Sequence, residues 1–153
     1  MLKVRLWRQT CLESLRTTHE LTEEMQEEFY RDVICNPNSN HRYWMMNDGA
    51  SLAGLTYIDW INRIAEISLI VDPSRSKKGY GEASVLELIR KGFNELGLNE
   101  IYGECYLCNP GLGFWKKMAE KYKWYTTVLP RRKLWKLKYY DSLYFSVKGV
   151  PND

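Results

Sequence analysis

Hydrophobic residues recur at helical spacing in some segments of the chain and at strand-like spacing in others. Residues 21–34 begin with Thr22 at an N-cap position, followed by acidic residues in the first turn. Met25, Phe29 and Val33 then follow four residues apart. An apolar stripe of this period predicts a helix whose acidic side faces solvent.

Strand-like runs follow this helix. Two of them flank Asn47-Asp48-Gly49, a sequence typical of a hairpin turn. The β-branched run 63–71 predicts a strand that stops before Pro73. Residues 80–97 then return to helical spacing and end at Gly97, the residue type that favours a helix C-terminus.

The C-terminal third predicts one more strand, a short helix and a closing pair of strands. Residues 100–108 form the strand, and Asn109 is expected to cap a helix with Pro110 at its first position. The closing strands, 124–129 and 139–148, flank the basic segment "PRRKLWKLK".

This order of elements predicts an α/β fold of the mixed (α+β) kind within a single domain, residues 1–153. A strand–helix–strand unit requires a right-handed crossover and parallel pairing, here inside an otherwise antiparallel sheet. The first ten residues are ambiguous, because Leu2, Val4 and Leu6 alternate as in a strand while the same segment also suits a helix.

Composition narrows the class of protein. The chain has 153 residues, 44% hydrophobic and 27% charged, with a net charge of +3, which is ordinary for a globular protein and too weak to argue for nucleic acid. No run approaches a membrane span and the first residues lack a signal-peptide core, so we expect a cytoplasmic protein that does not bind membranes. The four cysteines lack zinc spacing and are expected to be reduced thiols, with no metal site.

The segment "SKKGYG", residues 76–81, carries the most specific chemistry. It lies between a predicted strand and a predicted helix, where unpaired N–H groups and the helix dipole attract anions. Glycines allow close approach to the backbone and two lysines add positive charge. Neither the Walker loop nor the dinucleotide fingerprint is present, since Ser84 stands where the latter needs its third glycine.

The surrounding sequence resembles the GNAT N-acetyltransferase superfamily. "AEISLIVDP" looks like the family's fourth strand, "KKGYGEASVLELI" like its pyrophosphate loop and helix, and "GLNEIYGECYLCNP" like its fifth strand with a trailing Asn-Pro. "FWKKM" resembles the helix that follows. Upstream, residues 20–46 and "YIDWINRIAEI" resemble the RimJ/RimL-type subgroup, which acetylates protein N-termini or amino sugars on nucleotide carriers.

The resemblance implies a GNAT-like fold, with a mostly antiparallel sheet, one splayed parallel strand pair and flanking helices. It also implies acetyl-CoA as cosubstrate, and direct acetyl transfer to a primary amine of a small molecule, amino sugar nucleotide or protein N-terminus. Glu66 matches an acidic residue that some members use as general base, and its apolar neighbours could raise its pKa; Glu104 is the spare. The residues implied to bind the coenzyme are Leu69, Ile70, Val71, Ser76, Lys77, Lys78, Gly79, Tyr80, Gly81, Asn109 and Trp115.

Three departures from the family pattern leave alternatives open. Ser76 replaces the expected Arg or Gln, and Trp115 aligns with the tyrosine that protonates the leaving thiolate in many members. Trp7-Arg8 resembles the Trp-Arg-Asn motif that follows the first helix in the family. If it is this motif, the first family strand is missing or very short. Tyr80, Tyr106 and Tyr122 are the alternative acids, and nothing in the sequence ranks them.

The sequence also allows other roles for these residues and other functions for the protein. Glu66 could simply form an ion pair with Arg63 or another basic residue, and Asn109 could be only a helix cap. His41 could face an acceptor groove. The protein could also be a non-catalytic acyl-CoA-binding protein, or, on the basic-aromatic segment 129–140, an RNA-binding module. We expect an amine acceptor, no nucleic acid, and a monomer or homodimer.

Overall fold

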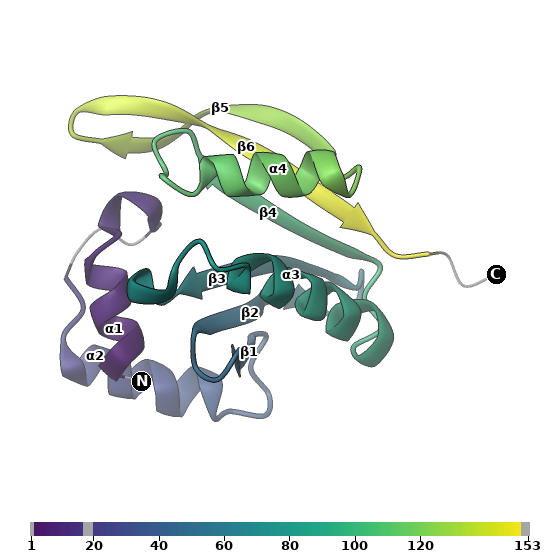
Figure 1. The fold of residues 1–153 in the computed structure, drawn as a ribbon. Helices are drawn as coiled ribbons and strands as arrows, with labels where there is room; N and C mark the ends of the chain where they lie inside the picture. Colours follow the sequence, from purple (N-terminus) through teal and green to yellow (C-terminus); the bar gives the residue numbers. More distant parts are fainter. Residues whose placement is uncertain (1, 17–19, 151–153) are drawn as a thin grey trace.

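The computed structural model describes residues 2–16 and 20–150 of the chain, with the side chain of Leu2 excluded (Figure 1). Six strands form one mixed sheet in the order β1-β2-β3-β4-β6-β5. The strands are β1 (Arg42–Met46), β2 (Ser51–Asp59), β3 (Ile64–Val71), β4 (Glu100–Tyr106), β5 (Tyr125–Trp135) and β6 (Lys138–Lys148). The α-helices are α1 (Leu2–Gln9), α2 (Glu23–Phe29), α3 (Tyr80–Arg90) and α4 (Leu112–Lys121). Short turns of 3-10 helix, η1 (Leu12–Ser14) and η3 (Pro73–Arg75), and of π-helix, η2 (Tyr30–Ile34) and η4 (Lys91–Glu95), complete the elements.

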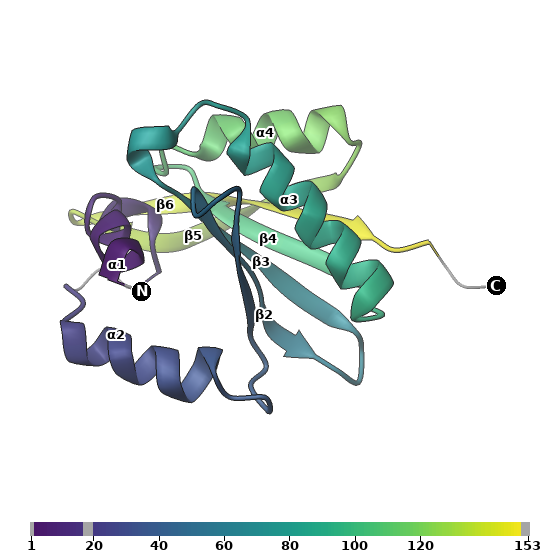
Figure 2. The same cartoon turned by 60° about the horizontal axis from the view of Figure 1, so that its bottom comes forward.

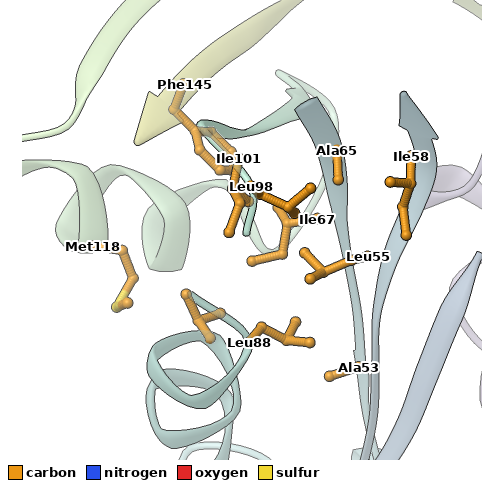
Figure 3. Packing of buried hydrophobic residues seen from close by; sticks show 11 residues of the cluster. Ala53, Leu55, Ile58, Ala65, Ile67, Leu88, Leu98, Ile101, Met118 and Phe145 are labelled. Atoms are coloured by element: carbon orange, nitrogen blue, oxygen red, sulfur yellow. The ribbon is translucent and has the colours of Figure 1, made fainter. Parts of the chain in front are cut away.

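Helices cover the sheet from both sides. Figure 2 shows α3 and α4 on one face, and α1 and α2 below the other. The core lies between the sheet and α3, where Leu55, Ile67 and Ile101 meet Leu88 (Figure 3). Glycine is needed at Gly103, because a Cβ there would lie 2.3 Å from the Phe145 ring. The sheet face that packs on α3 and α4 is therefore the apolar one.

The two parallel strands of the sheet separate soon after they meet. β3 and β4 pair only through Ile64–Glu66 and Glu100–Tyr102. β3 continues along its antiparallel partner β2 as far as Val71, and β4 continues along β6. The predicted mixed sheet with a splayed parallel pair is confirmed.

The ambiguous N-terminus is a helix, and the strand alternative is wrong. Val4 and Trp7, three residues apart, are both buried, whereas Leu6 is 55% exposed. Burial thus follows the helical period rather than the alternation of the leucines and valine. No strand precedes β1 in the described part of the chain, where only helical elements are found.

Two boundaries near the C-terminus differ from the sequence prediction. The helix after Asn109 begins at Leu112 rather than Pro110, because Asn109 Oδ1 accepts a hydrogen bond from Gly111 N and forms a turn first. The first closing strand, predicted to end at Leu129, continues into the basic segment, since β5 runs to Trp135. It turns through two residues of positive φ, Lys136 and Leu137, before β6. Among the described residues, no helix is both long and apolar enough to span a membrane.

Candidate active site

A pocket of about 590 Å³ opens where β3 and β4 diverge. Its lining includes Ile67 and Leu69 from one face of β3, and Glu66, Ser68 and Ile70 from the other. Because the pocket collects residues from both faces, it passes through the split in the sheet. Residues of α1, α2 and β1 line it on the Glu66 side, whereas Trp115 and Phe145 line it on the α4 side.

Glu66 lies in the floor of this pocket and is 8% exposed. Burial raises the pKa of its carboxyl group, Arg16 opposes the rise, and the nearby Glu104 carboxylate adds to it. The ion-pair partner is Arg16, which lies 50 residues earlier in the chain, and not the neighbouring Arg63. A carboxyl group with a raised pKa in the lining of a pocket is a suitable proton acceptor.

Glu104 lies beside Glu66 on the neighbouring strand. Arg16 Nη2 lies 3.7 Å from Glu104 Oε2, and thus contacts both carboxylates. Glu104 also accepts hydrogen bonds of 2.8 Å from Arg132 Nε and from Ser142 Oγ. Burial alone would raise the pKa of Glu104, but Arg132, Ser142 and Arg16 together lower it. Glu104 is therefore a fixed anion, which fits a structural role better than a proton acceptor.

The β3 residues predicted to hold the pantetheine arm have different positions. Leu69 and Ile70 line the pocket, whereas Val71 does not. Val71 pairs with Ser51 at the far end of the strand. Beyond Glu66, the edge of β3 that faces β4 makes no ladder pairing, so its N–H and C=O groups are available to a ligand.

The predicted pyrophosphate loop, residues 76–81, lies at the N-terminus of α3 and outside the pocket lining. Gly79 is the N-cap with φ +81°, and among the described residues no side chain caps the helix there. The first N–H groups of α3 are thus free of side-chain acceptors. Lys77 and Lys78 are exposed beside them. A Cβ on Gly81 would lie 3.2 Å from the Phe114 ring and 3.8 Å from Leu69, so the loop adjoins the α4 side of the pocket.

Buried polar contacts hold the β1–β2 turn against the start of α3. Asn47 Nδ2 donates to Ser84 Oγ at 2.8 Å, and to Ser51 Oγ and Tyr80 O at 3.2 Å each. Ser51 and Ser84 are fully buried and hydrogen-bonded to each other at 2.7 Å. Arg75, whose guanidinium lies 5.1 Å from the Tyr80 ring, covers the outside. Nothing in the sequence pointed to Asn47 as more than a turn residue.

Asn109 and Trp115 line the pocket from the β4–α4 side. Asn109 Oδ1 accepts from Gly111 N at 2.7 Å and from Ser14 Oγ at 3.0 Å, so its oxygen is engaged in capping. Trp115 stacks on Phe145 with ring centroids 4.7 Å apart. This packing makes Trp115 a wall of the pocket.

The structure separates the three tyrosines that the sequence could not rank. Tyr106 lines the pocket. Tyr122 donates its hydroxyl to Glu82 Oε1 at 2.6 Å, and Tyr80 packs under Arg75; neither of them lines the pocket. Burial raises the pKa of Tyr106, with Arg16 opposing, and the phenol therefore stays protonated at neutral pH.

Several pocket residues had no signal in the sequence. Arg16, Tyr43 and Tyr57 line the Glu66 side, together with the predicted His41. His41 stacks edge-on against Tyr57 at 4.9 Å, and its Nδ1 is buried with no hydrogen-bond partner among the described residues. Tyr57 has φ +49° at a break in the β2–β3 register, an irregularity that no local pattern predicted.

Comparison with known families agrees with this architecture. A model of the family described as "Acetyltransferase (GNAT) domain" matches residues 4–113, which is most of the chain. The chain belongs to this GNAT acetyltransferase family. The match spans α1 to the start of α4, and thus includes β3, the glycine loop and β4. The comparison with curated proteins found no match.

Solved structures of GNAT acetyltransferases share the fold at low sequence identity. A mutant form of the spermidine/spermine N-acetyltransferase from Vibrio cholerae is 18% identical, with a TM-score of 0.79, over 95% of this chain and 86% of that one. A dodecameric structure of spermidine N-acetyltransferase from the same organism is 19% identical, with a TM-score of 0.77, over 95% and 85%. A probable acetyltransferase is 21% identical, with a TM-score of 0.63, over 80% and 66%; this chain therefore spans just under two thirds of that protein.

Proposed function

We propose that this GNAT protein transfers the acetyl group of acetyl-CoA directly to a primary amine. The observation that carries the proposal is the position of Glu66, a buried carboxylate in the floor of a pocket that passes through the split between β3 and β4. One half of the pocket offers an unpaired strand edge for the pantetheine arm. The other half offers polar and aromatic side chains for an acceptor.

The proton balance assigns a role to Glu66. An alkyl amine has a pKa near ~10 and arrives as an ammonium ion, so it must lose a proton before its lone pair can attack. The Glu66 carboxylate takes that proton. The nitrogen then attacks the thioester carbonyl carbon, a C–N bond forms, and the oxyanion is held by N–H groups of the free β3 edge near Leu69 and Ile70.

Collapse of the tetrahedral intermediate breaks the C–S bond and releases the second amine proton as the amide forms. Tyr106 donates a proton to the departing thiolate, since it is the one tyrosine of the three alternatives that lines the pocket, and the second amine proton then restores its phenol. The products are the acetylated amine, coenzyme A and the proton held by Glu66. Trp115 takes no part in proton transfer and shapes the channel instead.

The coenzyme phosphates fit the residues at the N-terminus of α3. The uncapped first turn, Gly79 in its left-handed conformation and the exposed Lys77 and Lys78 together provide N–H donors and positive charge. Tyr80 and Gly81 supply backbone to the same loop. Ser76 is uncharged, so Lys77 and Lys78 supply the positive charge of the loop. Asn109 can offer only its amide N–H groups to the coenzyme, because its side-chain oxygen already accepts two hydrogen bonds.

The finer assignments are proposals too. We propose a small amine as acceptor, in line with the spermidine named for the similar structures, and we keep amino sugar nucleotides and protein N-termini as alternatives. The RimJ/RimL-like placement, a cytoplasmic location, a single domain over residues 1–153, and a monomer or homodimer likewise remain predictions. The RNA-binding alternative loses support, because Arg132 bonds to Glu104 and Lys133 bonds to backbone carbonyls of residues 13 and 15.

The test is calorimetric titration of acetyl-CoA into the protein and into two double variants. Lys77→Glu/Lys78→Glu reverses two charges in the loop, and should weaken binding by about tenfold or more if both lysines contact phosphate. Lys116→Glu/Lys117→Glu changes the net charge equally on the exposed side of α4 and should bind as the wild type. Thioester turnover with a panel of amines then follows. Binding without turnover of any amine would favour the non-catalytic acyl-CoA-binding alternative.

A further inference from the structure

Arg16 places a positive charge where an acceptor amine would meet the proposed base. Its Nη2 forms an ion pair with Glu66 Oε1 and lies 3.7 Å from Glu104 Oε2. The centre of the guanidinium lies 6.0 Å from the centroid of the Tyr57 ring. Two carboxylates and an aromatic face are the surroundings that proteins use to bind an organic cation.

The two partners of this ion pair differ sharply in exposure. The side chain of Arg16 is 49% exposed, whereas those of Glu66 and Glu104 are 10% and 9% exposed. The guanidinium can therefore move into water at little cost. The buried carboxylates cannot, and removing their cation without replacing it is unfavourable. A cation that enters the pocket replaces the positive charge that the two carboxylates lose when Arg16 moves away.

The backbone that carries Arg16 is firmly held. Residues 12–16 form a strap, fastened by Lys133 Nζ, which donates to Glu13 O at 2.6 Å and to Leu15 O at 2.7 Å. Ser14 Oγ donates to Asn109 Oδ1 at 3.0 Å. Lys133 is 7% exposed, so its charge is committed to these carbonyls. The strap fixes the backbone position of Arg16, whereas its guanidinium is free to move.

We propose that Arg16 occupies the ammonium subsite of the acceptor and selects for amines that replace its guanidinium between Glu66 and Glu104. This inference rests on the proposed function, and names the residue that sets the acceptor class. The favoured acceptor is a small aliphatic amine or diamine. A carboxylate on the same short chain is disfavoured, because it would enter a floor that already holds two carboxylates.

Titration of 1,4-diaminobutane into the wild type and into Arg16→Gln, without acetyl-CoA, tests the displacement. Removing the competing guanidinium should tighten diamine binding by about two- to fivefold, the range expected for a half-exposed ion pair. Arg16→Lys retains a competing cation and should stay close to the wild type. 4-Aminobutanoate, which exchanges one ammonium for a carboxylate, should bind more weakly than the diamine in all three proteins.

Two control variants distinguish the effect of vacating the space beside Glu66 from the effect of removing a positive charge elsewhere. Arg90→Gln removes an arginine of nearly equal exposure, 48%, whose partners Glu87 and Glu95 lie on the outside of α3 and η4. It should leave diamine affinity unchanged. Arg132→Gln removes a guanidinium from Glu104 without vacating the space beside Glu66, because Arg132 does not line the pocket. It should tighten binding less than Arg16→Gln does.

A gain of affinity is a result that damage to the fold would not produce. Weaker or unchanged diamine binding in Arg16→Gln would overturn the proposal, as would an equal gain in Arg132→Gln. Tighter binding of 4-aminobutanoate than of the diamine by the wild type, lost in Arg16→Gln, would make Arg16 a carboxylate ligand and would also overturn it. Because these titrations need no acetyl-CoA, failure of the proposed acetyl transfer would be seen separately.

Discussion

Glu66, at the last position of β3 that pairs with β4, and Glu104, just beyond the last position of β4 that pairs with β3, share the guanidinium of Arg16, yet the pKa values of their carboxyl groups are shifted in opposite directions. The difference comes from their partners. Glu104 has the hydrogen bonds of Arg132 and Ser142 in addition to its share of Arg16, whereas the side-chain partner of Glu66 among the described residues is Arg16. One carboxylate is held as an anion and the other is ready to accept a proton, an arrangement typical of acid–base sites.

Glu66→Gln should lower kcat/KM by about 10²–10⁴, the usual contribution of a general base. Activity of the wild type should fall as pH drops through the pKa of Glu66, which lies above the ordinary glutamate value, and this limb should vanish in the variant. Acetyl-CoA affinity should not change. The control is Glu100→Gln, a similarly buried carboxylate paired with Lys148 outside the pocket. Equal losses in both variants would argue against a base role for Glu66.

Glu104→Gln should destabilise the protein at neutral pH by about 1–3 kcal/mol, since Arg132 and Ser142 lose a buried charged acceptor. The folded-state pKa of Glu104 is lowered, so its contribution is present above the unfolded-state pKa and is lost as pH falls through the folded value. Urea denaturation at pH 7 and near pH ~4 should therefore show a shrinking difference from the wild type.

Glu66→Gln provides the matched comparison for stability. The folded-state pKa of Glu66 is raised, so its ionised form costs stability that returns as pH falls. This variant should unfold at the same urea concentration as the wild type at pH 7, or at a higher one. A loss of stability at pH 7 as large as that of Glu104→Gln would contradict the opposite pKa shifts of the two carboxyl groups.

The elements that could be predicted from sequence are those with a local cause. The strand 64–71, the helix that starts after Gly79 and the turn at Asn47 each follow from a run of neighbouring residues. Arg16 illustrates what could not be predicted, because its role depends on a partner 50 residues away and on strands that diverge. Lys133 is a second example. Strand alternation in a basic segment suggests exposed charge, whereas its ammonium is buried against carbonyls of the strap.

Asn47→Ala should weaken acetyl-CoA binding although Asn47 lies outside the loop. Its side chain joins the β1–β2 turn to Ser84 and to the carbonyl of Tyr80, at the start of α3. Loss of these partly buried bonds should cost about 1–3 kcal/mol of stability and loosen the first turn of the helix. Asp48→Ala is the control, since Asp48 has the same left-handed backbone, φ +52° against +54°, but an exposed side chain. If both variants lose acetyl-CoA affinity equally, backbone strain in the turn is responsible, and not the hydrogen bonds of Asn47.

Tyr106→Phe should lower kcat by about tenfold or more while leaving acetyl-CoA affinity unchanged, because the phenol would donate its proton only as the thiolate departs. Burial raises the pKa of Tyr106, so activity that depends on its protonated form should decline only above the ordinary tyrosine range, near pH ~10. Tyr122→Phe removes a hydroxyl that bonds to Glu82 at the α3–α4 contact, and should affect stability rather than kcat. Full turnover by Tyr106→Phe, with the alkaline limb intact, would mean that water protonates the thiolate and that Tyr106 only lines the channel.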